Sequence, residues 1–260
     1  MGELASRFAT IIIVGGLGIL TVLYSTWSMM MFYLAFYLGI AWEYNGLVQS
    51  DHNGSISAII VTVLPVIWHY SPFDDLEGII HLMSLIVLLP AFILSPIGFL
   101  KAVVGVIWIF PALWCCISLS LSDGPLQVII IMTIIWLTDG MAYLVGKAIG
   151  RTKLAPTVSP NKTIEGTVFG IILSIGLTYI ISLWYFEIKQ HDLLMLALLT
   201  GVTGSVGDLL ESFFKRKLGV KDSGTLMGLH GGGLDRTDSV LIAMPFAYVY
   251  LYFAPFQYII

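Results

Sequence analysis

The stretch KRKLGVKDSGTLMGLHGGGLDRTDS, residues 215–239, separates two apolar runs and differs from both in composition. Eight of the 24 residues from Lys215 to Asp238 are charged, whereas only 11% of the whole chain is charged. Residues 193–206 before it and residues 239–258 after it are almost entirely apolar. A polar segment between two apolar runs predicts a loop that joins two helices at one face of a membrane.

The rest of the chain is as apolar as a membrane protein requires. Hydrophobic residues make up 58% of the sequence, and the mean hydropathy is +0.94. Soluble globular proteins contain about 45–50% apolar residues. Apolar stretches near or above the roughly 18–20 residues that cross a bilayer recur along the chain. We therefore predict an all-α fold and a polytopic integral membrane protein.

Nine candidate transmembrane helices follow from the apolar runs and from the turn residues that interrupt them. They cover residues 8–24, 27–46, 55–70, 78–95, 99–119, 125–149, 166–186, 193–214 and 239–258. The first run lacks a clean small-residue cleavage site, and further apolar runs follow it at once. We therefore expect a retained helix there and not a signal peptide.

The twelve Lys and Arg residues indicate the orientation of these helices. With nine spans and a cytoplasmic N-terminus, only Lys189 falls outside the cytoplasm. The other eleven are Arg7, Lys101, Lys147, Arg151, Lys153, Lys162, Lys215, Arg216, Lys217, Lys221 and Arg236. Cytoplasmic loops of membrane proteins carry an excess of Lys and Arg. We therefore expect the polar loops 150–165 and 215–238 to share the cytoplasmic face.

Two pairs of carboxylates lie near the 215–238 loop. Asp208 and Glu211 are spaced i,i+3 and so share one helical face, and Asp235 and Asp238 repeat this spacing. A charge inside a membrane is costly unless a cavity or a partner receives it. Alternatively, these carboxylates lie at helix ends, where they face water or stabilise a helix N-terminus. For Asp238, this interpretation and a functional role fit the sequence equally well.

Two further acidic residues lie within apolar runs. Asp139 falls in the segment Trp136–Tyr143, inside a predicted span. Glu43 stands between Trp42 and Tyr44, near the inner end of the second span. Interfacial anchoring and a functional role are both open for Glu43.

Cations and glycines accompany these carboxylates. The basic members of the loop are Lys215, Arg216, Lys217, Lys221 and Arg236. Such a cluster is most often an orientation signal or a lipid-headgroup contact, but here it is interleaved with Asp222, His230 and the run Gly231–Gly233. Glycines let the backbone approach a ligand closely and turn amide N–H groups towards anions. This combination suits a divalent metal bound to a polyphosphate, although no Walker A sequence is present.

The 150–165 loop has a similar character. Three cations and several hydroxyl groups lie just before a predicted helix start at residue 166. Thr163 or Ser159 is a candidate cap for that helix, with Pro160 setting the entry of the chain. A cap does not require Lys162, so a phosphate contact is also open for this lysine.

These polar segments resemble the signature of a known enzyme family. The matching elements are Ser212-x-x-Lys215-Arg216, Lys221-Asp222-Ser-Gly224, His230-Gly231-Gly232 and Leu234-Asp235-Arg236-Thr-Asp238. Together they closely resemble the phosphatidate cytidylyltransferases, or CDP-diacylglycerol synthases. The segments Trp136–Tyr143 and Ser159–Gly166 are similar to that family's upstream motifs. The resemblance covers about 100 residues, 136–239, and Gly228-Leu229 stand where the family usually has Pro-Gly.

The resemblance implies a reaction and a functional division of the chain. CTP and phosphatidate would give CDP-diacylglycerol and pyrophosphate, with Mg²⁺ required. Residues 1–125 would form N-terminal transmembrane helices, and residues 126–260 a transmembrane catalytic region with the cytosolic loops 150–165 and 215–238. Phospholipid biosynthesis would be the setting.

The resemblance also implies roles for individual residues. The expected catalytic residues are Asp208, Asp235, Lys221 and Arg236. The expected substrate-binding residues are Ser159, Lys162, Ser212, Lys215, Arg216, Asp222, His230, Gly231 and Gly232. The expected ligands of Mg²⁺ are Asp208 and Asp235, supported by Asp238 or Glu211.

Two other functions are compatible with parts of the pattern. In an ion-coupled transporter, Asp139, Asp208 and Glu211 would form a cation path, but no paired half-repeats with interrupted helices are visible. A CTP-dependent lipid or polyprenol kinase would transfer the γ-phosphate and release CDP.

The expected partners are CTP, phosphatidate in the bilayer and membrane lipids. We expect no nucleic acid, with a homodimer as a candidate assembly. The expected location is a membrane, the inner membrane if the source is bacterial, with the active site on its cytoplasmic side.

Overall fold

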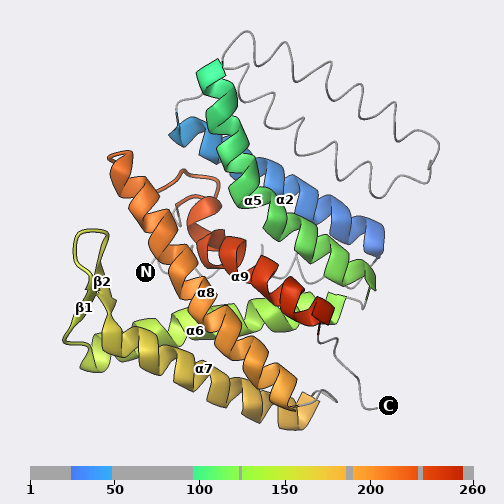
Figure 1. The fold of residues 1–260 in the computed structure, drawn as a ribbon, viewed down its shortest axis with the longest axis vertical. Coiled ribbons are helices and arrows are strands. Elements are labelled where there is room, and N and C mark those ends of the chain that lie inside the picture. Colours follow the sequence, from blue (N-terminus) through green and yellow to red (C-terminus); the bar gives the residue numbers. More distant parts are fainter. Residues whose placement is uncertain (1–24, 49–95, 123–124, 186–189, 228–230, 254–260) are drawn as a thin grey trace, which may run out of the picture. The chain divides into compact units, whose positions relative to one another are not determined.

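A computed structural model describes residues 25–48, 96–122, 125–185, 190–227 and 231–253. Within these ranges the chain forms six helices and one two-stranded sheet (Figure 1). The helices are α2 (Thr26–Leu47), α5 (Pro96–Ser122), α6 (Pro125–Ile149), α7 (Ile164–Tyr185), α8 (Gln190–Lys217) and α9 (Leu234–Phe253). The strands are β1 (Lys153–Ala155) and β2 (Ser159–Thr163).

The apolar runs predicted helices correctly wherever the structure describes them. All six predicted helices in the described ranges are present, and the predicted helices 8–24, 55–70 and 78–95 lie outside these ranges. The largest shift concerns α9, which begins at Leu234 and not at residue 239. Its first turn contains charged residues that an apolar pattern overlooks, although an acidic residue such as Asp235 is favourable at a helix N-terminus.

The expectation of an all-α fold requires one correction, in the 150–165 loop. Strands β1 and β2 form an antiparallel hairpin in which Lys153 pairs with Thr163 and Ala155 with Ser159. The Thr163 hydroxyl accepts a hydrogen bond from the backbone N–H of Gly166 at 3.1 Å. Of the two candidate caps, Thr163 is therefore the one that caps α7. A short polar strand such as Ser159–Thr163 has no apolar alternation, and hydrophobic periodicity therefore misses it.

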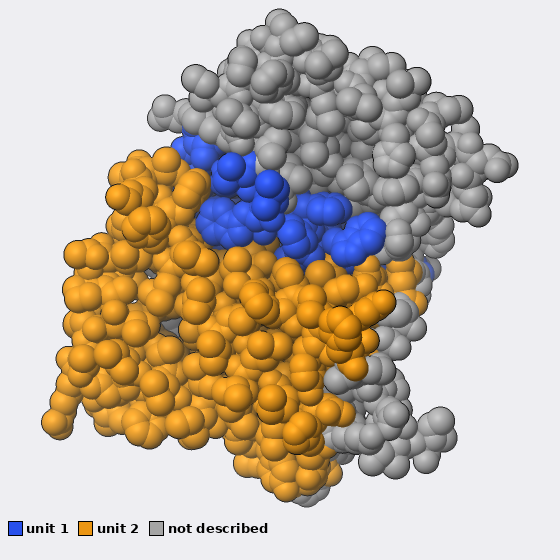
Figure 2. All heavy atoms as spheres, viewed as in Figure 1, with its two compact units in different colours: residues 1–114, 222–236 blue, residues 115–221, 237–260 orange. Residues whose placement is uncertain are grey.

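The chain divides into two compact units (Figure 2). Unit 1 contains residues 1–114 and 222–236, and unit 2 contains residues 115–221 and 237–260. The backbone passes between the units within α5, between residues 221 and 222 in the loop after α8, and within α9. The boundary predicted at residue 125 separates N-terminal helices from a catalytic region. The two compact units do not test this boundary, so it stays a prediction.

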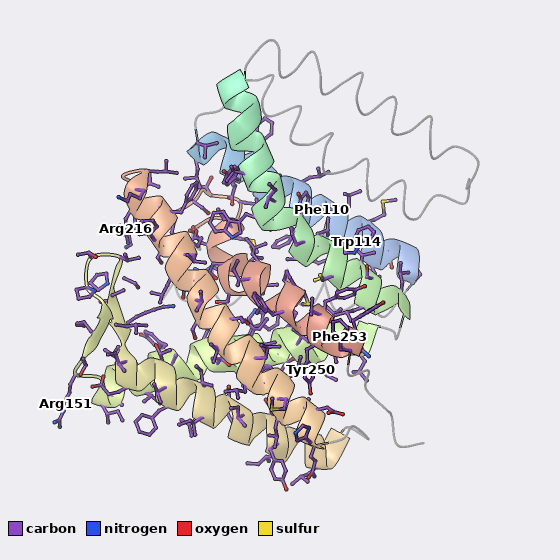
Figure 3. The ribbon with its side chains drawn as sticks, viewed as in Figure 1. Phe110, Trp114, Arg151, Arg216, Tyr250 and Phe253 are labelled. Atoms are coloured by element: carbon purple, nitrogen blue, oxygen red, sulfur yellow. The ribbon has the colours of Figure 1, made fainter. Side chains whose placement is uncertain are left out.

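Aromatic side chains pack α2 against α5 in unit 1. The rings of Tyr44 and Trp108 meet edge to face at 6.3 Å between centroids, and Tyr37 meets Phe110 at 6.5 Å. Phe110 also lies near Trp114, one turn further along α5 (Figure 3). These contacts fix the register of α2, the helix that carries Glu43.

Small residues bring α6 and α7 close together in unit 2. A Cβ atom at Gly170 of α7 would lie 2.6 Å from the backbone of Ala142 in α6. Near this crossing, the Thr138 hydroxyl donates a hydrogen bond to Ser174 at 2.8 Å. Close approach of this kind, with hydroxyls bonded across helices, is typical of packing in membrane proteins.

Two described helices are long and apolar enough to cross a membrane, namely Leu126–Ile149 and Gln190–Lys217. Two shorter helical stretches, Ile107–Leu121 and Ile164–Ile180, are also apolar. Large apolar side chains such as Trp136 and Ile172 are exposed on these helices, at 58% and 54%. An exposed apolar side chain on a helix of this kind is suited to contact with lipid.

Candidate active site

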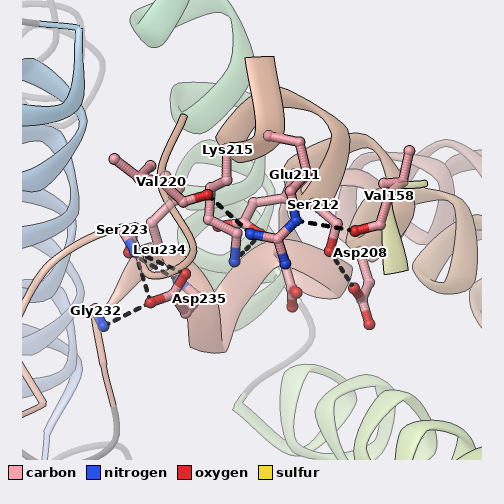
Figure 4. A network of polar contacts seen from close by, with 12 residues as sticks. Val158, Asp208, Glu211, Ser212, Lys215, Val220, Ser223, Gly232, Leu234 and Asp235 are labelled. Atoms are coloured by element: carbon pink, nitrogen blue, oxygen red, sulfur yellow. Dashed lines mark hydrogen bonds and ion pairs between the residues drawn. The ribbon is translucent and has the colours of Figure 1, made fainter. Parts of the chain in front are cut away.

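Asp208 of α8 forms the centre of a polar cluster in unit 2. Its carboxylate makes an ion pair with the ammonium group of Lys162, which extends from β2. The Ser212 hydroxyl, one turn further along α8, lies 3.4 Å from Asp208 Oδ1 (Figure 4). The side chains of Lys162 and Asp208 are 26% and 23% exposed, so water and solutes reach the pair. The structure thus joins the 150–165 loop to α8 through predicted site residues.

A second ion pair is buried beside the first. Lys215 Nζ lies 2.6 Å from Glu211 Oε2, and the Glu211 side chain is completely buried. The pair follows the i,i+4 spacing of a helix. Removal of one partner from a buried ion pair costs about 3–5 kcal/mol, because the other charge stays behind without compensation. Glu211 and Lys215 are therefore expected to be needed together.

Close packing of α8 and α9 places further carboxylates beside Asp208. A Cβ atom at Gly207 would lie 2.6 Å from the carbonyl oxygen of Asp238, so glycine is required for this contact. Electrostatic repulsion acts between Asp208 and both Asp139 and Asp238. The Ser239 hydroxyl donates a hydrogen bond to Asp139 Oδ2 at 3.0 Å. Asp139 thus joins the cluster, although it was absent from the predicted site.

The chemistry of this cluster fits a divalent cation. Carboxylate oxygens are the ligands that Mg²⁺ prefers, and carboxylates that repel one another favour binding of a cation. In the part of the chain that the structure describes, however, no three His, Cys, Asp or Glu side chains already form a metal-binding group. The predicted metal ligands Asp208, Asp235, Asp238 and Glu211 stay a prediction.

Asp235 organises the loop in unit 1. Its carboxylate accepts hydrogen bonds from the backbone N–H groups of Ser223, at 2.9 Å, and of Gly232, at 2.8 Å (Figure 4). The Ser223 hydroxyl in turn accepts a hydrogen bond from the Asp235 N–H at 3.3 Å. Gly231 adopts φ +83°, a left-handed conformation that favours glycine.

Glu43 holds the same loop, a contact that sequence patterns do not indicate. Glu43 Oε1 accepts a hydrogen bond from the Leu226 N–H at 2.8 Å, and Oε2 accepts one from the Leu234 N–H at 3.2 Å. The available signal was an acidic residue within an apolar helix. Because the bonded residues lie 183 and 191 positions away, no local pattern identifies the partner.

Arg216 connects the hairpin to the loop that follows α8 within unit 2. Its Nε donates a hydrogen bond to the Val158 carbonyl at 3.2 Å, and Nη1 donates to the Val220 carbonyl at 2.9 Å (Figure 4). These bonds give Arg216 a structural role, and the phosphate contact predicted for it stays a prediction.

The remaining predicted residues have varied positions. Ser159 lies in β2, and Lys221, Asp222 and Arg236 are exposed. His230 lies outside the described residues. Asp208 belongs to unit 2 and Asp235 to unit 1, so their expected convergence on one metal ion stays a prediction.

The structure shows a helical chain with two helices long and apolar enough to cross a membrane, and a charged cluster on α8 that Lys162 of β2 joins. Residues 5–254 match the model of the Cytidylyltransferase family. The chain belongs to this family.

Individual relatives are similar to this chain over part of their length. The phosphatidate cytidylyltransferase of Bacillus subtilis (strain 168) is 48% identical over 119 residues, which is 45% of this chain and 44% of that protein. The phosphatidate cytidylyltransferase of Staphylococcus haemolyticus (strain JCSC1435) is 43% identical over 126 residues, 48% of each chain. The enzyme of the same name from Staphylococcus aureus (strain COL) is 43% identical over 128 residues, also 48% of each. The chain thus spans about half the length of the curated relatives it matches.

Proposed function

We propose that this chain is a phosphatidate cytidylyltransferase, a nucleotidyltransferase that converts CTP and phosphatidate into CDP-diacylglycerol and pyrophosphate. The observation that carries the proposal is the charged cluster around Asp208, with Lys162 reaching it from another element. Membership of the Cytidylyltransferase family and the names of the relatives support the same reaction.

The reaction consists of one displacement at phosphorus. A phosphate oxygen of phosphatidate attacks the α-phosphorus of CTP and forms a new P–O bond. The bond between the α-phosphorus and the oxygen bridging to the β-phosphate breaks, and its electrons leave with pyrophosphate. Phosphatidate is already anionic, so the step needs no strong general base. The main tasks of the protein are to position the reactants and to balance charge.

Cations of the chain bind the phosphates and screen their mutual repulsion. Lys162, Lys215, Arg216, Lys221 and Arg236 are the proposed phosphate contacts. Ser159, Ser212, Asp222, His230, Gly231 and Gly232 complete the proposed substrate site. When bound by Asp208, Asp235, Asp238 or Glu211, Mg²⁺ would neutralise charge on the nucleophile and on the departing pyrophosphate.

The proposal includes the arrangement of the chain in the membrane. The chain has about nine transmembrane helices and a cytoplasmic N-terminus, with the active site on the cytoplasmic side. This is the inner membrane if the source is bacterial. A homodimer is the candidate assembly. The distribution of Lys and Arg supports the orientation.

The purified chain in detergent provides the test. Phosphatidate and CTP are supplied with Mg²⁺, and the lipid extract is analysed for CDP-diacylglycerol. We expect this product only when both substrates are present. A well-folded preparation that makes no CDP-diacylglycerol would rule out the proposed function.

A further inference from the structure

Glu43 of α2 accepts hydrogen bonds from two loop segments of unit 1, residues 223–227 and 231–234, through separate oxygens. One oxygen accepts the N–H of Leu226 and the other accepts the N–H of Leu234. Glu43 is only 8% exposed, so little water competes for these hydrogen bonds. Hydrogen bonds to an ionised carboxylate are about twice as strong as those between neutral groups. One side chain therefore fixes two points of the loop.

Buried Glu43 is poorly suited to anchoring at a membrane surface. An interfacial anchor extends its polar end towards water or headgroups. The neighbouring Trp42 is 62% exposed, whereas Glu43 faces the interior of unit 1. Of the two roles that the sequence left open for Glu43, the geometry supports the functional one.

Glycines of the loop give independent evidence that Glu43 and the backbone fit together closely. A Cβ atom at Gly224 would lie 2.5 Å from Glu43 Oε1, and one at Gly232 would lie 2.6 Å from Oε2. Real Cβ atoms essentially never come so close to another heavy atom. Glycine at these two positions therefore lets the loop close around the Glu43 carboxylate, a different reason from approach to a ligand.

Asp235 depends on the same loop. Its carboxylate accepts N–H groups from Ser223 and Gly232, and Glu43 holds Leu226 and Leu234 close to these residues in the chain. A shift of the loop would therefore move Asp235 and the amide of Gly232 together.

We propose that Glu43 is a positioning residue, which holds the loop segments 223–227 and 231–234 in the arrangement that the reaction requires. Glu43 acts through Asp235 and the loop amides. This inference rests on the proposed function, because Asp235 and Gly232 belong to the proposed substrate site.

Two substitutions at Glu43 separate its chemistry from its size. Glu43→Gln keeps the shape but replaces one accepting oxygen with an NH₂ group, which cannot accept an N–H. Glu43→Asp keeps two accepting oxygens on a stem that is shorter by one methylene. Ile117→Ala is the control, because Ile117 is completely buried in α5, so that its loss should lower stability, and its apolar side chain makes none of the hydrogen bonds that hold the loop.

The experiment measures kcat and KM for CTP, together with amide hydrogen exchange in peptides covering 223–227 and 231–236. For Glu43→Gln we expect kcat/KM to fall between about tenfold and about hundredfold, since small misplacements in an active site have effects of this size. Exchange of both peptides should become faster. Glu43→Asp should recover part of the activity, and Ile117→Ala should unfold at a lower temperature with kcat/KM unchanged.

Each result has one meaning for the proposal. Wild-type kinetics in Glu43→Gln would overturn the positioning role, even if exchange became faster. Unchanged exchange would show that Glu43 does not hold the loop. If kcat/KM fell equally in Ile117→Ala and Glu43→Gln, the effect would be general destabilisation, which would also overturn the role. Absence of turnover in the wild type would instead reject the proposed function, and the exchange data would still show whether Glu43 holds the loop.

Discussion

Lys162 connects a strand to the helix that carries Asp208, and its ammonium group compensates the negative charge of that carboxylate. In the proposed reaction, the same ammonium group would also attract phosphate oxygens of CTP. Replacement by methionine keeps the apolar stem of the side chain and removes the charge.

We therefore expect Lys162→Met to lower kcat/KM for CTP by at least about a hundredfold, because the lost interactions involve charges at the reacting phosphates. Lys153→Met is the matched control, since Lys153 lies exposed in the partner strand β1 of the same hairpin. Initial rates at several CTP concentrations test this prediction. Equal losses in the two variants would show that Lys162 acts only through the hairpin.

Lys221 and Lys217 provide a second matched pair. Lys221 belongs to the residues that resemble the enzyme family, whereas Lys217 does not, and Lys217 lies over the ring of Phe213 at 5.4 Å. We expect Lys221→Ala to weaken the use of CTP or phosphatidate about tenfold or more, while Lys217→Ala stays near normal. Membrane insertion should be unchanged in both. Near-normal activity of both variants would mean that this basic cluster serves only as an orientation signal.

At this scale the sequence identified some of the residues that the structure brings into contact. Lys162, Asp208, Glu211 and Lys215 lie in or next to the polar segments of an apolar chain, and the structure pairs Lys162 with Asp208 and Lys215 with Glu211. Glu43 differs because its partners are backbone N–H groups, which every non-proline residue carries. Only the folded chain shows which of these groups it meets.

The packing of α7 against α6 leaves different amounts of space at two glycines of α7. Gly170 of α7 lies against the Ala142 backbone, whereas a Cβ atom at Gly176, further along the same helix, would meet no atom within 4 Å. An added methyl group in a close contact typically costs about 1–3 kcal/mol. In open space, alanine is more favourable in a helix than glycine by roughly 0.5–1 kcal/mol.

We expect Gly170→Ala to lower the unfolding temperature by several degrees, because α7 must move away from α6. Gly176→Ala should leave it unchanged or raise it slightly. Thermal unfolding of the detergent-solubilised variants measures both effects. A stable Gly170→Ala variant would contradict the close packing of α6 and α7.

The elements were easier to predict than their contacts. Long apolar runs ending in turn residues identified α2, α5, α6, α7, α8 and α9. The β1–β2 hairpin escaped prediction because its residues are mostly polar, and its stability depends on contacts from outside. Glu165 accepts backbone N–H groups of Arg151 and Thr152, and Arg216 bonds the Val158 carbonyl at the turn. Such contacts have no periodic signature in the sequence.

The whole chain has an unequal distribution of positive charge that bears on its orientation. Eleven of the twelve Lys and Arg residues fall on one side of the predicted topology, and Lys189 falls on the other. Charge asymmetry of this kind sets the orientation of membrane proteins. Loops 150–165 and 215–238 should therefore face the cytoplasm together.

Reporter fusions at the N-terminus and after Ile260 test this topology. We expect the first reporter in the cytoplasm and the second on the external side, as an odd number of spans requires. Both reporters on the same side would contradict the nine-span arrangement. Fusions within residues 150–165 and 215–238 would then show whether the two loops still share a face.

The proposed reaction transfers the cytidylyl group and not the γ-phosphate of CTP. Two preparations of CTP, labelled at the α- or at the γ-phosphorus, distinguish these reactions when each is supplied with phosphatidate and Mg²⁺. We predict that the α-label enters the lipid and the γ-label is released as pyrophosphate, with both signals lost in Asp208→Asn. Entry of the γ-label into the lipid, with release of CDP, would contradict the account.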